Sequence, residues 1–355
     1  MSGTLPTVRW GILGTGWVSD KFAKDLVLSR EDARASHVIK AVGTSSVAKG
    51  SAFLDGVFAD SSASRPALYT DYADVYADPD VDIVYIGTPH ALHKANCLDA
   101  IAAGKHVLCE KPFTVNEDEA REVVAAAKAK GVFLMEAMWT RFFPLFGDLR
   151  KAIHSDRVIG QVRRVFCDFS LAMDLEALPP TSRLKDPSLG AGALLDIGIY
   201  SLTWGFATLD PNMGDQAAQP KIDSSMTVVD DIDHAESIIL NYTESRKMGI
   251  LTASTYTKTP ETFCRVEGSD GVITLSGPAA SLPRKIIVCK PDGTETVKEY
   301  NHAGLGFFYE ADSVALDLAA GRKESEVMPL TETLRILRIM DDLRRSNGLR
   351  YPQDK

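Results

Sequence analysis

Cysteine is sparse in this chain, and its spacing argues against two kinds of site. The five cysteines among 355 residues are scattered, with no CxxC pair, so we expect neither a disulfide framework nor a zinc site, and we predict no metal. Reduced thiols in a cytoplasmic compartment are the simplest expectation for such cysteines.

Positive charge and long apolar runs are also in short supply. Lys and Arg number 39 against 48 Asp and Glu, a formal net charge of -9, which disfavours a nucleic-acid partner because phosphates need neutralising cations. No apolar stretch approaches the roughly 20 residues that span a bilayer, and the N-terminus has no basic segment followed by an apolar one. We therefore expect neither a membrane partner nor a secretory signal.

The length of the chain suits two domains, and the first 140 or so residues alternate between strand and helix patterns. We expect strands at residues 8–13, 38–43, 81–87, 105–109 and 132–136, with helices at 18–29, 90–103 and 116–130. Strands separated by helices imply crossover connections, and hence a parallel sheet with helices on both faces.

The pattern changes after residue 144. We expect a helix at 145–154, a strand at 161–172, a loop at 175–192, a helix at 193–208, and strands at 235–242, 247–256, 262–267, 272–276, 285–289 and 296–300. Short turns between successive strands predict an antiparallel sheet, and helices at 307–320 and 331–346 end the chain. The predicted domains are 1–144 and 145–355, with the C-terminal helix able to pack back on the first.

A glycine-rich turn follows the first predicted strand and opens the first predicted helix: Gly14-Thr15-Gly16-Trp17-Val18-Ser19. The two glycines let the backbone turn sharply and approach a pyrophosphate, and the helix start supplies free N–H groups. Ser19 stands at the third glycine position and is small enough for close helix–strand packing. This context predicts a dinucleotide-binding Rossmann domain. An ordinary glycine turn is the alternative.

The end of the second predicted strand bears on the choice of cofactor. An Asp or Glu there would bind the ribose 2′-hydroxyl and repel a 2′-phosphate. The chain instead has Ser45 and Ser46, with Lys49 just beyond. Hydroxyls and a nearby cation suit a phosphate, so we predict NADP, with NAD still possible. The alternative is that the serines only start the next helix.

Glu110-Lys111-Pro112 ends an apolar strand at the carboxyl edge of the predicted parallel sheet. Ligands bind at that edge in open α/β sheets, where a charged lysine could polarise a substrate oxygen. The proline makes a cis Lys111–Pro112 bond possible. A surface role is the default for any lysine, but this position favours function.

These motifs resemble the glucose–fructose oxidoreductase/inositol dehydrogenase/MocA (GFO/IDH/MocA) family over nearly the whole chain. The resemblance implies a Rossmann domain followed by an α+β domain with an open, mostly antiparallel sheet, and it makes Lys111 catalytic. Residues 133–144, 190–200 and 351–355 resemble the dimeric dihydrodiol dehydrogenase branch, which also contains NADP-dependent D-xylose dehydrogenases. Two positions depart from the family pattern: Ser45 stands where many NADP-using relatives carry Arg, and Ala191 interrupts a usual glycine triplet.

Asp196 and Tyr200 are four residues apart on a predicted helix and therefore share a face. A phenol is a weak base at neutral pH, but a nearby Lys111 ammonium would favour the phenolate. Tyr200 would then take the substrate hydroxyl proton as hydride leaves the carbon, while Asp196 would hold a substrate hydroxyl or steady Lys111. Without the family resemblance, a structural role would be commoner than a catalytic one for both Asp196 and Tyr200. The resemblance favours catalysis, since the dihydrodiol branch has Tyr at this position.

Several further residues are weaker candidates. By resemblance, the cofactor site includes Glu110, Trp139 and Arg141, together with the turn after the third predicted strand: Thr88, Pro89, His90 and His93. Local capping or packing is the alternative for the histidines, and core packing is the alternative for Trp139. Arg183, in the loop before Asp196, either reaches a substrate hydroxyl or is solvated.

The sequence therefore predicts an NADP-dependent oxidoreductase acting on a hydroxyl carbon of a sugar or cyclic diol. One face of the antiparallel sheet is expected to be free of helices, and burying it against a second copy would make a homodimer. The first alternative is an NAD-dependent inositol or polyol dehydrogenase of the same fold. The second is a non-catalytic cofactor-sensing regulator, which would not need Lys111, Asp196 and Tyr200 together.

Overall fold

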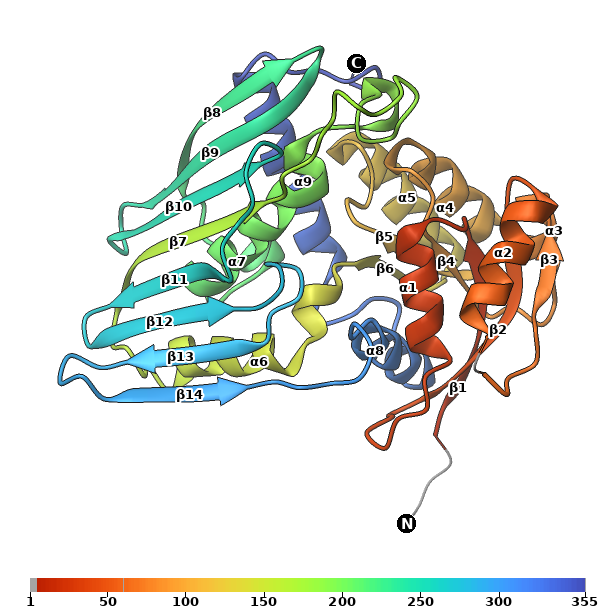
Figure 1. Ribbon diagram of the computed structural model, residues 1–355, viewed down its shortest axis with the longest axis horizontal. Helices are drawn as coiled ribbons and strands as arrows, with labels where there is room; N and C mark the ends of the chain where they lie inside the picture. The colour runs from red at the N-terminus through yellow and green to blue at the C-terminus, as the bar shows by residue number, and fades with distance from the viewer. Residues whose placement is uncertain (1–4, 60, 355) are drawn as a thin grey trace. The chain divides into compact units, whose positions relative to one another are not determined.

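The computed structural model describes residues 5–59 and 61–354, which divide into two units (Figure 1). Unit 1 comprises Met1–Thr114, Asp118–Phe142 and His302–Thr333. Unit 2 comprises Val115–Glu117, Phe143–Asn301 and Leu334–Lys355. A late segment of the chain thus belongs with the N-terminal unit.

Unit 1 is built on a six-stranded sheet with the order β3-β2-β1-β4-β5-β6, in which every neighbouring pair is parallel. The strands are β1 (Thr7–Leu13), β2 (Ser36–Gly43), β3 (Ala67–Tyr69), β4 (Ile83–Ile86), β5 (His106–Glu110) and β6 (Leu134–Ala137). The strand order reverses between β1 and β4, the point at which doubly wound sheets bind ligands. The predicted doubly wound parallel sheet is confirmed.

The helices of this unit fall close to their predicted positions, with additions. They are α1 (Trp17–Leu26), α2 (Val47–Val57), α3 (Tyr72–Ala77), α4 (His93–Ala102), α5 (Glu117–Lys130) and α8 (Phe308–Ala319), with single turns η1 (His90–Leu92) and η2 (Trp139–Phe142). The sequence-based prediction gave no range for α2 and missed β3 and α3. β3 has only three residues, Ala-Leu-Tyr, too few to show a period-two pattern.

Helix α8 joins unit 1 through a buried carboxylate and a stack of aromatic rings. Asp25 in α1 accepts backbone N–H bonds from Leu305 (3.1 Å), Gly306 (2.6 Å) and Phe307 (2.8 Å). Phe307 stacks on Trp139, with ring centres 4.2 Å apart. These contacts explain why residues 302–333 belong with the parallel sheet.

Unit 2 contains an eight-stranded sheet with the order β14-β13-β12-β11-β7-β10-β9-β8. The strands are β7 (Val162–Ser170), β8 (Lys221–Val229), β9 (Ile232–Tyr242), β10 (Lys247–Ser254), β11 (Thr262–Gly268), β12 (Gly271–Ser276), β13 (Lys285–Cys289) and β14 (Glu295–Glu299). β7 and β10 pair in parallel and the other neighbours are antiparallel, so the mostly antiparallel sheet is confirmed. The prediction missed β8, a largely exposed edge strand.

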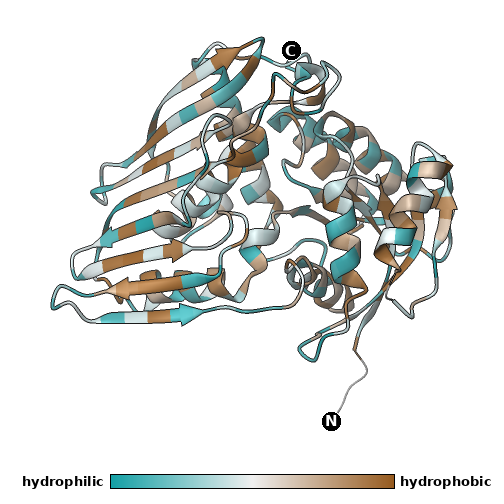
Figure 2. Cartoon of the chain, viewed as in Figure 1, coloured by the Kyte–Doolittle hydropathy of each residue, from teal (hydrophilic) through white to brown (hydrophobic). Residues whose placement is uncertain are grey.

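The two faces of this sheet differ. Val165, Cys167 and Phe169 of β7 are buried towards α7 (Ile199–Leu209), whereas Arg164 and Phe166 on the other face are at least partly exposed. Figure 2 shows hydrophobic and hydrophilic bands alternating along the strands, the pattern of a sheet covered on one face. The remaining helices are α6 (Pro144–Arg150), which continues into a π turn η3 (Lys151–Ser155), and α9 (Leu330–Ser346).

The most apolar helical segment, Pro187–Leu209, meets the length and composition criteria for a membrane span. Of its most apolar window, 83% is buried within the structure, and all of α7 is buried. The core helix of a globular domain meets the same criteria, so the segment is weak evidence for a membrane span.

Candidate active site

The glycine-rich turn of unit 1 needs glycine at its first position. Gly14 has φ +83°, and a Cβ there would lie 3.0 Å from the Gly87 carbonyl oxygen. Its N–H donates to the Gly43 carbonyl oxygen at 3.0 Å, so the turn lies where β1, β2 and β4 end. Both the backbone conformation and the close approach exclude a side chain at this position.

The start of α1 is open to a ligand. Gly16 is the N-cap residue and provides no side-chain cap, and a Cβ on it would meet nothing within 4 Å. The next residue, Trp17, is 69% exposed. A Cβ on Gly87 would overlap the Ser19 hydroxyl, so helix and strand pack as closely as the sequence suggested. Helix N–H groups without a side-chain cap, facing open space, suit an anion.

The end of β2 is lined with hydroxyl groups. The Thr44 and Thr15 hydroxyls lie 3.3 Å apart. Ser46 caps α2 by accepting a hydrogen bond from the Lys49 N–H at 3.3 Å, so this serine does start the helix, and its role towards a phosphate stays a prediction. Ser45 borders a cavity.

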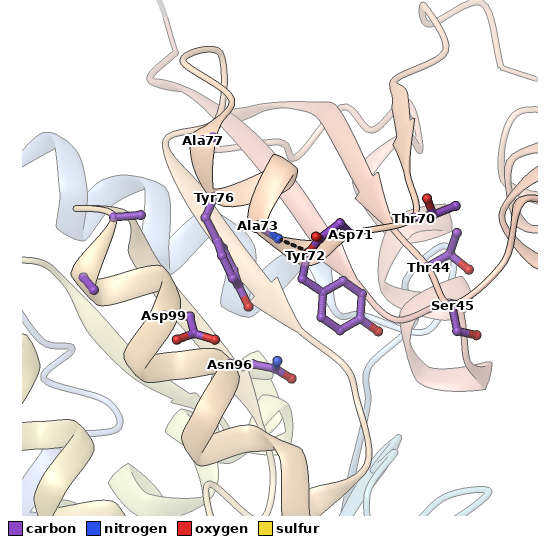
Figure 3. A pocket seen from close by; sticks show the side chains of 12 residues that line it. Thr44, Ser45, Thr70, Asp71, Tyr72, Ala73, Tyr76, Ala77, Asn96 and Asp99 are labelled. Atoms are coloured by element: carbon purple, nitrogen blue, oxygen red, sulfur yellow. Dashed lines mark hydrogen bonds between the residues drawn. The ribbon is translucent and has the colours of Figure 1, made fainter.

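That cavity has a volume of about 850 Å³ and lies wholly within unit 1 (Figure 3). Tyr72 lies between Thr44 and Ser45 on one side and Tyr76 on the other. The complete lining is Thr44, Ser45, Thr70, Asp71, Tyr72, Ala73, Tyr76, Ala77, Asn96, Asp99, Ala102 and Ala103. Asp71 caps α3 by accepting from the Ala73 N–H at 2.9 Å. Aromatic rings beside hydroxyl groups suit a planar base with an attached sugar.

Sequence reasoning missed the part of this cavity that follows β3. A signal was present, because Asp71 is an N-cap residue directly before a short helical run. The run of six residues is too short to be recognised without the strand before it.

The Glu-Lys-Pro strand end is held by hydrogen bonds from two neighbouring strands. Glu110 is buried, and it accepts a hydrogen bond from the Tyr85 hydroxyl of β4 at 2.6 Å. Glu136 of β6 accepts from the Phe113 N–H at 3.1 Å, just after the cis Lys111–Pro112 bond. Burial raises the pKa of Glu136 to about 7. The backbone on both sides of Lys111 is therefore fixed.

The histidines after β4 are packed inside unit 1. His93 is fully buried, and its ring nitrogens lie 2.8 Å from the Thr88 carbonyl oxygen and 3.0 Å from that of Pro112. Burial lowers the pKa of His93. His90 is also buried, with its ring centre 5.8 Å from that of His93. His93 therefore bridges two strand ends, as the packing alternative predicts.

Trp139 and Arg141 also have partners within unit 1. Trp139 is buried on Phe307. Arg141 lies 3.2 Å from the Glu332 carboxylate, and both side chains are buried. The packing alternative for Trp139 thus has direct support, and the cofactor roles of the two residues stay predictions.

In unit 2, the expected helix over 193–208 begins differently. Leu194–Gly198 forms a π turn, η5, which continues into α7. Asp196 lies on the π turn and Tyr200 in the first turn of α7. Single π turns inside helices are frequent at functional sites.

The loop before this turn brings Arg183 to Asp196. An Arg183 Nη1 lies 3.4 Å from an Asp196 Oδ1, and the two side chains are 49% and 15% exposed. Tyr200 is buried, with its ring edge against Phe169 at 5.3 Å between centres. Arg183 is therefore neither isolated nor simply solvated. It is a partner of Asp196, the residue predicted to orient the substrate.

Comparison with known proteins decides the family. Residues 8–138 match the oxidoreductase family with an NAD-binding Rossmann fold, and residues 146–274 match the GFO/IDH/MocA C-terminal domain. The chain is 37% identical over 379 residues to D-xylose 1-dehydrogenase (NADP(+)) of Hypocrea jecorina, covering 99% of this chain and 95% of that relative. This chain belongs to the GFO/IDH/MocA family.

Other relatives agree with this assignment. The GFO/IDH/MocA chain is 34% identical over 355 residues to trans-1,2-dihydrobenzene-1,2-diol dehydrogenase of Bos taurus, covering 98% of this chain and 99% of the relative. Its fold matches that of aldose-aldose oxidoreductase from Caulobacter crescentus with a TM-score of 0.80 at 21% identity, covering 96% and 98% of the two chains. The predicted resemblance is confirmed, and this GFO/IDH/MocA protein is an NAD(P)-binding oxidoreductase.

Proposed function

We propose that this protein is an NADP-dependent dehydrogenase that oxidises a hydroxyl-bearing carbon of a sugar or a cyclic diol, of the D-xylose or trans-dihydrodiol type. The observation that carries the proposal is the order of neighbouring strands in unit 1. Because β1, β4 and β5 are adjacent and parallel, the turn at Gly14, the turn at Thr88 and Lys111 all follow strand ends at one edge of the sheet. The names of the two relatives support the substrate class.

The residues of unit 1 fit a dinucleotide. Gly14, Gly16 and the start of α1 would hold the pyrophosphate, and the cavity beside Ser45 and Tyr72 would hold the adenosine. No acid stands between Gly43 and Lys49, so a 2′-phosphate would meet hydroxyls, Lys49 and the N-terminus of α2. When bound there, NADP supplies the hydride acceptor.

The remaining chemistry falls to three side chains. In this proposal the Lys111 ammonium stabilises negative charge on the reacting oxygen, and Tyr200 accepts the hydroxyl proton. Asp196, steadied by Arg183, orients a neighbouring hydroxyl group of the substrate.

A homodimer and a cytoplasmic location complete the proposal. The uncovered face of the unit 2 sheet carries exposed apolar residues, with Ile239 at 41%, Met248 at 38% and Val297 at 48% exposure. Burying this face against a second copy would remove that apolar area from water.

All five cysteines are free thiols, which supports a reducing compartment.

Analytical ultracentrifugation of Ile239→Glu tests the dimer. We expect the parent to sediment with the mass of two copies and Ile239→Glu with the mass of one. The matched control is Val229→Glu, at an apolar residue 44% exposed that ends β8, which should stay dimeric. A monomeric parent would refute this part of the proposal.

A reduction screen tests the activity. NADP and NAD are offered with pentoses, hexoses, inositols and trans-dihydrodiols, and reduced cofactor is measured by absorbance. We expect turnover with NADP on a pentose or a dihydrodiol. A higher kcat/KM with NAD on an inositol would identify the NAD-dependent alternative, and tight NADPH binding without turnover on any substrate would identify a regulator.

A further inference from the structure

The π turn that carries Asp196 is fixed by a carboxylate from the neighbouring sheet. The N–H of Leu194 donates to Asp233 Oδ2 of β9 at 2.5 Å, while the turn has no side-chain cap of its own. Gly192 has φ +139°, and a Cβ on it would overlap Asp233 Oδ1. A Cβ on Gly198, at the other end of the turn, would overlap Glu236 Oε1. Two glycines thus leave room for two carboxyl groups.

A β-bulge brings these two acids to the same face of β9. Residues three apart in a regular strand point to opposite faces. Here Asp233 pairs with Val228 and Ala235 pairs with Thr227, which leaves His234 as an extra residue on β9. As a result both acids are buried, with Asp233 at 0% and Glu236 at 3% exposure.

Glu236 has no hydrogen-bond donor among the residues that the structure describes. Neither of its oxygens accepts a hydrogen bond. The charged groups that act on it are carboxylates, Asp233 of the same strand and Asp168 of β7. Burial raises its pKa well above the ordinary value, and the negative charge of Asp233 adds to the effect.

Asp233 has hydrogen-bond donors, but it has no ion-pair partner among the described residues. It accepts from the Leu194 N–H and from the Tyr351 hydroxyl at 3.4 Å. Arg344 lowers its pKa only from a distance, because that guanidinium binds Asp341 and Asp354, each at 2.5 Å. Burial still raises the pKa of Asp233. Two buried carboxylates without a cation cannot both stay ionised.

We propose that Asp233 and Glu236 share one proton, and that Glu236 is a positioning residue that fixes the turn Leu194–Gly198 and thereby Asp196 and Tyr200. The two carboxyl groups lie within hydrogen-bond reach of each other, so with Glu236 protonated its hydroxyl can donate to Asp233, which in turn accepts from the Leu194 N–H. The expected effect of Glu236 on kcat rests on the proposed catalytic roles of Asp196 and Tyr200. The shared proton does not depend on those roles.

Raising the pH should therefore loosen the turn. The titratable or charged groups that face the pair are Asp168 of β7, Asp196 of the turn itself, and Tyr351 and Arg344 near the C-terminus. Loss of the shared proton would place two negative charges behind the turn. We expect kcat to fall on the alkaline side, while KM for NADP stays constant because the glycine-rich turn belongs to unit 1.

Three variants test the proposal: Glu236→Gln, Glu236→Ala and the control Glu244→Gln, which changes an exposed glutamate in the turn after the same strand. Glu236→Gln keeps the shape and a hydrogen-bond donor without a titratable proton. The parent-minus-Glu236→Gln infrared difference spectrum should contain the band of a protonated carboxyl group, and the Glu244→Gln difference spectrum should not. Hydrogen exchange of the peptide over residues 190–200 should be faster in Glu236→Ala than in Glu236→Gln or the parent.

Steady-state kinetics of the same variants provide a third readout. We expect Glu236→Gln to keep kcat near the parental value at neutral pH and to lose the alkaline decline, and Glu236→Ala to lower kcat by roughly 10- to 100-fold at unchanged KM for NADP. Absence of the carboxyl band would overturn the shared proton. Parental exchange rates in Glu236→Ala would overturn the positioning role even if no substrate is turned over. Absence of turnover in the parent, with both physical readouts as expected, would instead refute only the proposed function.

Discussion

The two units hold their candidate functional groups in different ways. In unit 1 the groups proposed to bind the cofactor are mainly backbone, namely the glycine turn after β1 and the uncapped start of α1. In unit 2 they are side chains on a π turn, which depends on an acid from β9. Backbone sites are defined by a few consecutive residues, whereas the π turn depends on residues about 40 positions away in the chain. Mutations should therefore act locally in unit 1 and through distant partners in unit 2.

The largest expected effect is that of Lys111→Ala, which tests whether a strand end in unit 1 contributes a reacting side chain as well as backbone. We expect kcat to fall about 10³-fold, within the range of a lost catalytic side chain, while NADPH still binds. Steady-state kinetics and NADPH fluorescence titration measure the two effects. Lys128→Ala, at an exposed lysine near the end of α5, is the control. Parental turnover in Lys111→Ala would remove Lys111 from the mechanism.

Gly14→Ala sharpens the contrast by straining the backbone of the turn. We expect NADP affinity to fall by roughly 5- to 100-fold, the equivalent of 1–3 kcal/mol of strain. Gly293→Ala is a matched control, because Gly293 has nearly the same φ, +85° against +83°, and a Cβ there would meet nothing within 4 Å. Both variants should lose stability in thermal melts, but only Gly14→Ala should lose NADP affinity. Equal affinities would mean that the turn does not contact the cofactor.

Glu136→Gln tests whether a buried side chain stabilises unit 1 behind the Glu-Lys-Pro strand end, where Glu136 accepts a hydrogen bond from the Phe113 N–H. Because the folded-state pKa of Glu136, about 7, is above its ordinary value, its contribution to stability is complete below that ordinary value and is lost as the pH rises through about 7. Urea unfolding of the parent should therefore show a loss on the order of 2–3 kcal/mol between pH 5 and pH 8, reduced in Glu136→Gln. An unchanged pH dependence would show that Glu136 does not titrate in this range.

The smallest expected effect is that of Lys49→Ala. Lys49 lies in the first turn of α2 and is exposed, so the loss of one charge facing a phosphate should cost about 1 kcal/mol. We expect KM for NADP to rise several-fold and KM for NAD to stay the same, with Lys128→Ala again as the control. An equal rise for both cofactors would remove Lys49 from 2′-phosphate recognition.

The sequence predicted what depends on short segments. The glycine turn, the Glu-Lys-Pro strand end and both kinds of sheet were recognisable because each is encoded by consecutive residues or by a regular period. The three-residue strand β3 and the polar edge strand β8 escaped because neither shows enough of a period.

What the sequence could not predict depends on contacts between distant residues. The bulge at His234 is invisible in a single strand, because it exists only in the register of β9 against β8. Nothing in the chain near Asp196 indicates that Glu236 lies behind it. Similarly, the structure gives His93 two carbonyl neighbours that no local pattern reveals.

The order of synthesis has a consequence for unit 1. Asp25 is made early, but the N–H groups that it accepts from belong to residues 305–307, which follow all eight strands of unit 2 along the chain. In the nascent polypeptide Asp25 therefore lacks its native N–H donors until nearly nine-tenths of translation is complete. Severing the chain at any single point between residues 142 and 302 would separate α8 from the rest of the parallel-sheet unit.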